Sequence, residues 1–410
     1  MNQWTPVAEA RRLILSRIKP INGESWVPLR DALGCVLSRD IVAPFNVPGH
    51  DNSAMDGFAC RAADLSAEKD TALRVVGDSF AGHPCTQSVD SGQCVKIMTG
   101  AQIPIGADIV IPQEETHTGD AGEIIIVSSE RKVGTHVRAA GEDLRRGDAA
   151  LSAGQLCHPA EIGLMASLGI VEVPVKRKLR VAFFSTGDEL KSLGDTLIEG
   201  EVYDSNRHTL AAMLQQLGIK ATDLGVVADE AAALAETLDA AAAHHDVIIT
   251  SGGASVGEAD FIRPVLAERG EVLFWKVAMR PGRPLAYGKV GNADFFGLPG
   301  NPVSVMVCFY QFVRAALWKR AGRIGDGMLP TIPAITLAPL KKAPGRTEFQ
   351  RGIMSPKQDG NWTVRSTGDQ GSGILSSMTQ ANCFIVLEDS RGAVTTGETV
   401  QIQPFEGLVG

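Results

Sequence analysis

The sequence of 410 residues lacks closely spaced cysteines: its seven cysteines are scattered between Cys35 and Cys383, and none forms a C-x-x-C pair. Structural zinc sites and disulfide frameworks need such spacing, so neither is expected. Long hydrophobic runs are also missing, because no uncharged apolar stretch approaches the ~20 residues that span a bilayer. The sequence therefore predicts reduced, buried thiols in a cytoplasmic protein without a membrane segment.

An excess of positive charge is absent as well, since the net charge is −8 at pH 7. Nucleic-acid binding is driven by the neutralisation of phosphates, so a nucleic-acid partner is not expected. Residues 1–19 mix arginines and a glutamate with apolar residues, which predicts an amphipathic helix rather than a signal peptide. The sequence shows neither internal repeats nor a low-complexity linker. Its length favours two to four globular domains.

Strand and helix patterns alternate along residues 177–327, which predicts a three-layer α/β domain with a mostly parallel sheet. Strands are expected at 179–184, 221–227, 246–250, 271–278, 285–290 and 293–297. Helices are expected at 206–217, from an N-cap at Asp229 to about His245, after the 246–250 strand to about Arg269, and from Pro302 to about Arg320.

The other residues predict smaller domains around this one. Residues 46–143 read as a β-rich inserted domain with turns at Gly77-Asp78, Gly92-Gln93 and Gly134. Residues 1–45 and 144–176 flank it as a helical/β linker and dimerisation domain, with a helix from Pro159 to Leu168. Residues 328–410 contain short alternating runs separated by turn residues, which predicts a small C-terminal β-barrel.

Three loops that follow strands of the α/β domain are the candidate ligand site. Ligands bind outside the carboxyl ends of strands in an open parallel sheet, and glycine loops let backbone N–H groups approach phosphate. The second loop reads G-G-x-x-x-G without a following lysine, so it matches neither a dinucleotide fingerprint nor a Walker A loop. A tight strand–helix turn remains the alternative. The candidate ligand-binding residues are Ser185, Thr186, Gly187, Ser251, Gly252, Gly253, Ser255, Pro299, Gly300, Asn301 and Pro302.

Carboxylates beside these glycines favour a divalent metal that bridges protein and phosphate. Glu189 and Asp260 follow two different strands of one sheet, so they are the predicted Mg²⁺ ligands. Simple capping of the next segment is the alternative interpretation for Asp188 and Glu189.

A cationic segment, Lys276 to Pro284, contains Lys276, Arg280 and Arg283, which a Pro-Gly turn can bring together. Such a cluster suits a phosphate or another oxyanion, although a solvated surface loop is the simpler alternative. The polar segment Asp51–Phe58 is expected to line a pocket or to form Asx turns.

Specific motifs along the whole chain resemble one family. They are PGHDNSAMDGFA, KIMTGAQIP, AAGED, FSTGDEL, SGGASVGEAD, FWKVAMRPGRP, GLPGNPVS and PGRTEFQRG. With these motifs the chain resembles the molybdopterin molybdenumtransferases, the MoeA family, which includes the E domain of gephyrin. It departs from many relatives in having Arg280 and Arg283 in place of lysines and Ala139-Ala140 in place of arginines.

The resemblance implies an activity: Mg²⁺-dependent insertion of molybdate into adenylylated molybdopterin with release of AMP. It also implies an elongated homodimer whose active cleft combines the α/β domain of one subunit with the inserted domain of the other. Transient contacts with the adenylyltransferase and with molybdoenzyme maturation proteins are expected. The catalytic positions implied by the resemblance are Asp56, Thr99, Asp143, Asp188, Asp229 and Lys276, with Arg351 and Ser372 as substrate-binding residues. Arg280 joins the catalytic candidates because its charge suits an oxyanion.

Two other functions compete with this interpretation. A molybdopterin adenylyltransferase would need only the α/β domain, so the extra β-rich domains count against it. A receptor-clustering scaffold of the gephyrin type would need a long linker and a fused domain, and neither is expected here.

Overall fold

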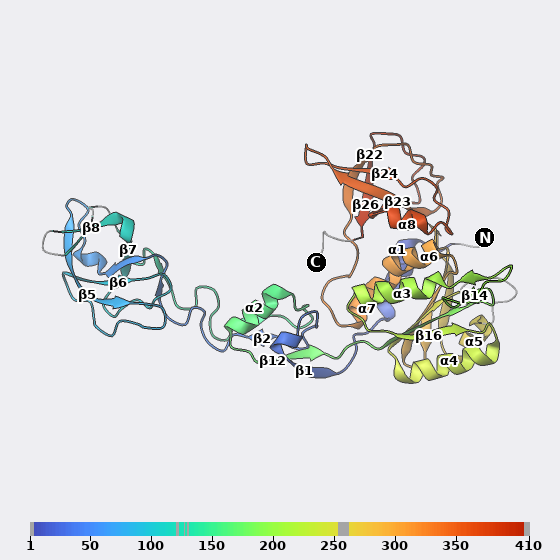
Figure 1. Ribbon diagram of the computed structural model, residues 1–410, viewed down its shortest axis with the longest axis horizontal. Helices are drawn as coiled ribbons and strands as arrows, with labels where there is room; N and C mark the ends of the chain where they lie inside the picture. Colours follow the sequence, from blue (N-terminus) through green and yellow to red (C-terminus); the bar gives the residue numbers. More distant parts are fainter. Residues whose placement is uncertain (1–3, 120–122, 127, 129–130, 253–261, 406–410) are drawn as a thin grey trace. The chain divides into compact units, whose positions relative to one another are not determined.

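The computed structural model describes residues 4–119, 123–126, 128, 131–252 and 262–405. The chain divides into two compact units (Figure 1). The first, here called the α/β unit, comprises Met1–Ser25, Gly34–Val36 and Val175–Gly410. The second, here called the inserted unit, comprises Trp26–Leu33 and Leu37–Pro174. The chain therefore passes from the α/β unit into the inserted unit and then returns to the α/β unit.

A six-stranded sheet forms the centre of the α/β unit. Its strands, in spatial order, are β16 (Thr222–Val227), β13 (Val181–Thr186), β17 (Val247–Ser251), β21 (Ala293–Leu298), β20 (Pro284–Val290) and β18 (Val272–Lys276). The first four strands are parallel, whereas β20 and β18 run antiparallel to their neighbours. Gly291 and Asn292 alone separate β20 from β21, and so short a loop permits only an antiparallel hairpin. The predicted, mostly parallel sheet is confirmed.

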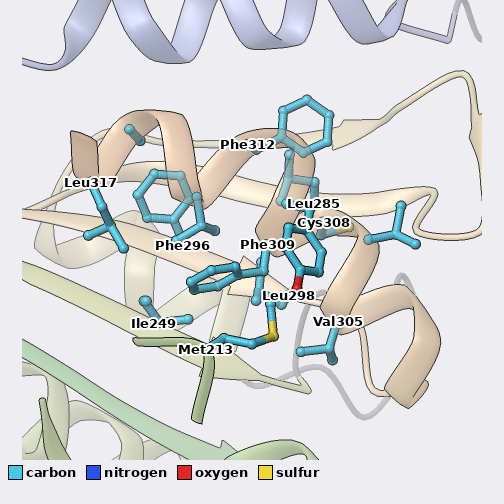
Figure 2. Packing of buried hydrophobic residues seen from close by; sticks show 14 of the residues in the cluster. Met213, Ile249, Leu285, Phe296, Leu298, Val305, Cys308, Phe309, Phe312 and Leu317 are labelled. Atoms are coloured by element: carbon cyan, nitrogen blue, oxygen red, sulfur yellow. The ribbon is translucent and has the colours of Figure 1, made fainter. Parts of the chain in front are cut away.

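Adjacent residues of each central strand enter opposite cores, because side chains alternate across a strand. Phe183, Ile249 and Phe296 belong to the core cluster shown in Figure 2, on the side of α3 (Ser205–Gln216) and the continuous helical stretch α6 (Pro302–Cys308), η4 (Phe309–Val313) and α7 (Arg314–Arg320). Phe184, Ile248 and Phe295 enter the second cluster, under α4 (Ala231–His244) and α5 (Ile262–Arg269). This division produces the three layers that the sequence predicts. The amphipathic N-terminal helix α1 (Val7–Arg17) packs against α7.

The C-terminal part of the α/β unit is a closed barrel. Its strands are β22 (Ile332–Thr336), β23 (Thr347–Pro356), β24 (Trp362–Ser366), β25 (Cys383–Leu387) and β26 (Thr399–Pro404). The ladder runs β23-β24-β22-β26-β25, and an additional β23–β25 pairing closes the ring. The short strand β19 (Met279–Arg280) pairs with β23, and helix α8 (Ser376–Gln380) lies beside it. The predicted small barrel is confirmed.

The inserted unit is built mainly from a sheet ordered β7-β4-β6-β5-β9-β8. Its strands are β4 (Gly57–Cys60), β5 (Thr71–Ser79), β6 (Gln93–Ile97), β7 (Ile109–Pro112), β8 (Thr116–Thr118) and β9 (Ile124–Ile126). Short pairs join β3 (Asn52–Ser53) to β10 (Val137–Arg138) and β2 (Ile41–Val42) to β11 (Ala149–Leu151). Helix α2 (Pro159–Ser167) packs on the 3₁₀ turn Leu29–Asp31, and β1 (Glu24–Pro28) pairs with β12 (Glu172–Lys176).

The predicted turn at Gly77-Asp78 is wrong, because both residues lie inside β5. The ladder with β6 shifts register between Val75 and Gly77, so the glycine marks a bulge rather than a turn. Within the described parts of the chain, no helix is long and apolar enough to cross a membrane.

Candidate functional site

The carboxyl ends of the parallel strands bring the three predicted loops together. Ser185 of β13 pairs in register with Ser251 of β17, and Ser251 pairs with Leu298 of β21. The segments that follow these strands therefore start side by side at one edge of the sheet. Ser185 and Ser251 are buried, whereas Gly300 and Asn301, beyond the end of β21, are exposed.

One side chain fastens two of these loops to each other. The Asn206 Nδ2 group donates hydrogen bonds to Ser251 Oγ at 2.8 Å and to the Gly300 carbonyl at 2.7 Å. Asn206 is buried in the first turn of α3, whose N-cap Asp204 accepts a bond from the backbone N–H of Arg207. The Ser185 hydroxyl donates to the same carboxylate, at 3.1 Å. The sheet edge is therefore rigidly tied to α3.

The glycines at this edge are required by close packing. Gly252 has φ +90°, and a Cβ there would lie 2.3 Å from the Thr186 carbonyl oxygen. A Cβ at Gly187 would lie 2.6 Å from Glu189 Oε2, so the glycine makes room for this carboxylate. A side chain at Gly252 would displace the backbone at Thr186, whereas one at Gly187 would displace the Glu189 carboxylate. The candidates Gly253, Ser255 and Asp260 fall outside the described residues.

Three carboxylates gather near the end of β13. Burial, followed by the negative charges of Asp188 and Glu189, raises the pKa of Asp229. Thr186 Oγ1 donates a long hydrogen bond of 3.5 Å to Asp229, which opposes this shift only partly. The prediction that Asp229 caps the alanine-rich helix is wrong: the N-cap of α4 is Glu230 and Asp229 faces Thr186. The helix therefore has its N-cap one residue later than the capping pattern predicts.

Uncompensated negative charge of this kind fits a divalent cation. The described residues contain no group of three or more His, Cys, Asp or Glu side chains arranged to hold a metal ion. Mg²⁺ needs less than that, because it usually retains several waters and takes one or two carboxylates together with substrate phosphates. Glu189 is thus a suitable ligand for Mg²⁺, and the neighbouring Asp188 and Asp229 add negative charge.

The cationic candidates of the α/β unit lie in the barrel, where Arg351 is part of β23, and in the segment before β20, which contains Lys276 and Arg280. Arg351 is fully buried and donates to Ser377 Oγ and the Gly371 carbonyl, both at 2.9 Å. Its Nη1 atom has no hydrogen-bond partner among the described residues. Burial, opposed by Asp369 and supported by nearby Arg280, lowers the pKa of Arg351 to about 10. A buried cation with a free donor is well suited to an oxyanion.

The barrel loop that carries Ser372 meets the third glycine loop directly. The backbone N–H of Val303, at the start of α6, donates to the Ser372 carbonyl at 3.2 Å. Arg280 is exposed and lies in β19, whose neighbour in β23 is Glu348. Lys276 ends β18. Ser372 therefore lies beside the start of α6, and the charge of Arg280 is felt at Arg351.

The Pro-Gly turn brings the backbone of Arg283 beside the residue after Lys276, because the Val277 N–H donates to the Arg283 carbonyl at 2.8 Å. That all three cations come together stays a prediction. The Arg283 guanidinium lies 5.6 Å from the ring centroid of Trp4, a distance typical of a cation–π contact. Arg346 lies over the same ring at 5.2 Å. Arg283 therefore helps to fix the N-terminal segment.

The inserted unit holds the remaining candidates. Asp56 follows β3, and its Oδ1 atom accepts hydrogen bonds from the Thr99 backbone N–H and the Thr99 hydroxyl, each at 2.7 Å. The backbone bond first and the hydroxyl second lower the pKa of this exposed carboxyl. Asp56 is therefore held ionised in a fixed orientation.

Asp143 lies elsewhere in the inserted unit, on a pocket of about 450 Å³. This pocket is lined by Val47, Pro48, Asn52, Arg138, Glu142 and Asp143. Asn52 is buried, and its Oδ1 atom has no partner among the described residues. The pocket therefore offers both carboxylate and amide acceptors, together with one arginine.

Sequence reasoning missed Asn206 and Asp204. Both belong to Tyr203-Asp204-Ser205-Asn206, where an Asp-Ser pair before a periodic segment signals a helix start. That signal could have located the N-cap. It could not show that Asn206, in the first turn of the helix, bonds residues 45 and 94 positions away.

Family models match nearly the whole chain. Residues 5–169 match the MoeA N-terminal region (domain I and II), residues 182–319 a probable molybdopterin binding domain, and residues 333–405 the MoeA C-terminal region (domain IV).

Individual relatives agree with these models. A molybdopterin molybdenumtransferase of Haemophilus influenzae is 44% identical over 402 residues, 98% of this chain and 99% of the relative. Gephyrin of Dictyostelium discoideum is 33% identical over 97% of this chain but only 62% of gephyrin. The crystal structure of a molybdopterin biosynthesis MoeA protein from Pyrococcus horikoshii has a TM-score of 0.84 at 30% identity and covers 98% of this chain and 100% of that one. The chain belongs to the MoeA family.

Proposed function

We propose that the chain is a molybdopterin molybdenumtransferase, an enzyme of molybdenum cofactor biosynthesis that inserts molybdate into adenylylated molybdopterin. Likeness to the Haemophilus influenzae enzyme along 98% of the chain supports this activity. The structural observation that carries the proposal is the edge of the sheet at which Asn206 joins the Ser251 and Gly300 loops. Glycine backbone and a carboxylate group meet there, as cleavage of a pyrophosphate link requires.

The nucleotide phosphates of the substrate would lie on the loops at Thr186, Gly252 and Gly300. Gly252 supports this placement because only a residue without a side chain fits against Thr186. Glu189, with Asp188 and Asp229 nearby and Asp260 as predicted from the sequence, would hold Mg²⁺. When bound, the ion offsets negative charge on the phosphates and on the departing AMP. The protein contributes the carboxylates and the loop backbone at the edge of the sheet.

Molybdate would bind at Arg351, Arg280 and Lys276. Molybdate is a tetrahedral dianion, and its transfer out of water is costly unless cations and donors replace the lost hydration. The free Nη1 atom of buried Arg351 is the strongest support for this assignment. The positive charge of Arg280 contributes to lowering the pKa of Arg351, which supports a shared cationic region.

A molybdate titration at saturating pterin tests the oxyanion assignment. Arg280→Gln should raise the half-saturating molybdate concentration at least severalfold, because one cation is lost. Arg280→Lys should be milder, and Arg365→Gln, on the exposed side of β24, is the matched control. If Arg280→Gln instead weakens pterin binding and leaves the molybdate response unchanged, the cluster recognises the organic substrate.

We further propose the homodimer, the four domains and the site residues that the resemblance implies. The domains are 1–45 with 144–176, then 46–143, 177–327 and 328–410. Asp56, Thr99 and Asp143 would act on the substrate held by the α/β unit. Mixing inactive Asp56→Ala and Glu189→Ala proteins should restore activity in mixed dimers if the two carboxylates serve one site from different subunits. No recovery after verified subunit exchange would place both carboxylates in one subunit's site.

The same assays would also reveal either of two other functions. An adenylyltransferase would consume ATP and produce adenylylated molybdopterin, and a scaffold would bind pterin without turnover. The match to the N-terminal and C-terminal MoeA regions favours the transferase over the adenylyltransferase. A cytoplasmic location and transient contacts with the adenylyltransferase and with maturation proteins belong to this proposal and rest on the resemblance.

A further inference from the structure

The opposite edge of the same sheet carries a second polar site. A pocket of about 410 Å³ opens there, between residues 19–22, the start of β13, the start of β17 and the β20–β21 turn. Five residues of β17 separate Asp246, on this pocket, from the glycine loop at Gly252. At about 3.3 Å per residue the two edges lie roughly 15–20 Å apart. The pocket is therefore distinct from the candidate substrate site.

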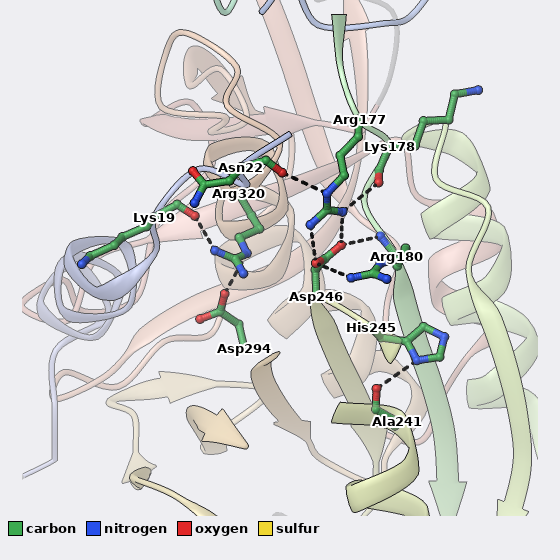
Figure 3. A network of polar contacts seen from close by, with 10 residues as sticks. All are labelled: Lys19, Asn22, Arg177, Lys178, Arg180, Ala241, His245, Asp246, Asp294 and Arg320. Carbon is green, nitrogen blue, oxygen red and sulfur yellow. Dashed lines mark hydrogen bonds and ion pairs between the residues drawn. The ribbon is translucent and has the colours of Figure 1, made fainter. Parts of the chain in front are cut away.

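Two arginines face one carboxylate in this pocket (Figure 3). Arg177 donates to both oxygens of Asp246, at 2.7 and 2.8 Å, and the backbone N–H of Arg180 donates to Oδ2 at 2.9 Å. These bonds already satisfy the carboxylate. The Arg180 guanidinium adds only one long contact of 3.4 Å, and 58% of its side chain is exposed. Arg180 is therefore largely available to a ligand.

Two more cations complete the lining. Arg320, only 13% exposed, forms an ion pair of 3.2 Å with Asp294, while its Nη1 atom donates to the Lys19 carbonyl at 2.7 Å. Asp294 also pairs with Lys289 at 3.0 Å, so it does not neutralise Arg320 alone. Lys19 is exposed, and its ammonium group has no partner within the described residues. Figure 3 shows two separate sets of contacts: Arg320 joins the Lys19 carbonyl and Asp294, whereas Arg177 and Arg180 meet on Asp246.

The charge of this pocket contrasts with that of the chain. Its lining contains four cations, Lys19, Arg177, Arg180 and Arg320, against one carboxylate, Asp246, which leaves an excess of three positive charges. The whole chain has a net charge of −8. Concentrated positive charge in a concave site attracts small anions and raises their local concentration. Arginine forks match the geometry of tetrahedral oxyanions.

We propose that this pocket is an anion-binding site for a tetrahedral oxyanion, either free or as a phosphate monoester. Arg180 would bind it directly and Lys19 would add positive charge at the rim, while Arg177 and Arg320 stay fixed by Asp246, Asp294 and backbone carbonyls. The volume admits a group larger than inorganic phosphate, since ligand pockets begin at about 300 Å³. The site does not depend on the proposed transferase activity, because none of its residues reaches the glycine loops.

Equilibrium dialysis of radiolabelled inorganic phosphate against the full chain, in Mg²⁺-free buffer at fixed ionic strength, tests the proposal. The decisive variant is Lys19→Gln with Arg180→Gln, which leaves the Arg177–Asp246 pair intact. It should weaken one class of phosphate sites at least tenfold, because the contact of Arg180 and the positive charge of Lys19 are both lost. Arg180→Lys alone should weaken it less. Arg365→Gln with Lys357→Gln, two exposed residues of the barrel, removes the same two charges and should bind as the unmodified chain does.

Parallel titrations with molybdate and AMP identify the source of the anion. Tighter binding of AMP than of phosphate in this class of sites indicates a phosphate monoester, whereas equal or tighter binding of phosphate or molybdate indicates a free oxyanion. The double variant should keep its melting temperature and its molybdate-insertion rate, so that loss of binding is not loss of fold. Phosphate isotherms that coincide for the double variant and the unmodified chain would overturn the proposal, as would no phosphate binding at millimolar concentrations.

Discussion

The Asn206 side chain donates a 2.8 Å hydrogen bond to the Ser251 hydroxyl, and so connects the first turn of α3 to the end of β17. The same amide holds the Gly300 carbonyl. The end of β17 and the backbone at Gly300 are thereby both tied to α3. Preorganisation of this kind lowers the entropy that substrate binding must offset.

Asn206→Ala should raise the KM for adenylylated molybdopterin more than it lowers kcat. Loss of the two bonds leaves a buried hydroxyl and a carbonyl without their donor, which should also destabilise the chain by about 1–3 kcal/mol. Steady-state kinetics with a thermal melt measure both effects. Asn361→Ala, in the exposed turn between β23 and β24, is the control. An unchanged KM in the folded variant would show that the loops hold their positions without Asn206.

Thr99→Val should shift the acid limb of the pH–rate profile to higher pH. The Thr99 backbone bond, followed by its hydroxyl, lowers the pKa of Asp56, and valine removes only the hydroxyl. The pKa of Asp56 should therefore rise part of the way to its ordinary value, and ionisation should require a higher pH. The rate at neutral pH should change little. An acid limb that stays in place would show that the ionisation of Asp56 does not limit the reaction.

Glu189→Gln should raise the Mg²⁺ concentration that gives half-maximal activity, by roughly tenfold for the loss of one charged ligand. Removal of this charge should also bring the pKa of Asp229 closer to its ordinary value, because Glu189 contributes to raising it. A Mg²⁺ titration at fixed substrate measures the effect. Glu199→Gln, in the exposed loop after β14 (Leu190–Lys191), is the matched control. Equal Mg²⁺ requirements in both variants would exclude Glu189 as a ligand.

Asp246→Asn should destabilise the chain at neutral pH by about 2–3 kcal/mol, since Arg177 loses its charged partner. Burial opposes ionisation of Asp246, but bonds from Arg177 and Arg180 outweigh it and lower the pKa below the ordinary 3.8. A depressed pKa contributes stability above the unfolded value and loses it as the pH falls through the folded one. Urea unfolding at several pH values should show the variant's deficit shrinking below about pH 4. A deficit that is constant from pH 7 to pH 3 would contradict this assignment.

The sequence was sufficient for the strands that carry the site. Val247–Ser251 begins with the apolar run Val-Ile-Ile and is followed by glycine, which identifies a buried parallel strand and its ligand loop. The barrel strand β23 was not predicted, because its alternation is broken by Gln350 and Arg351, polar residues buried by long-range contacts. The sequence motifs named Arg351, but its burial and its bonds to Ser377 and Gly371 needed the structure.

Local sequence patterns could not predict contacts between side chains that are far apart in the sequence. Asp229 stands where an N-cap is expected, and only the packing of β13 against β16 shows that it meets Thr186 instead. The charge of Arg283 suits an oxyanion cluster, yet its guanidinium lies over the ring of Trp4, about 280 residues earlier. In both cases tertiary contacts override a local preference.

A single-turnover reaction of the purified chain with adenylylated molybdopterin, Mg²⁺ and molybdate tests the proposed transferase most directly. AMP and pterin-bound molybdenum are quantified at each time point, with ATP absent. Transfer predicts that the two products appear together in a 1:1 ratio and that Arg280→Gln slows both at low molybdate. AMP release without molybdenum in the pterin, or no AMP at all from a correctly folded chain, would contradict it.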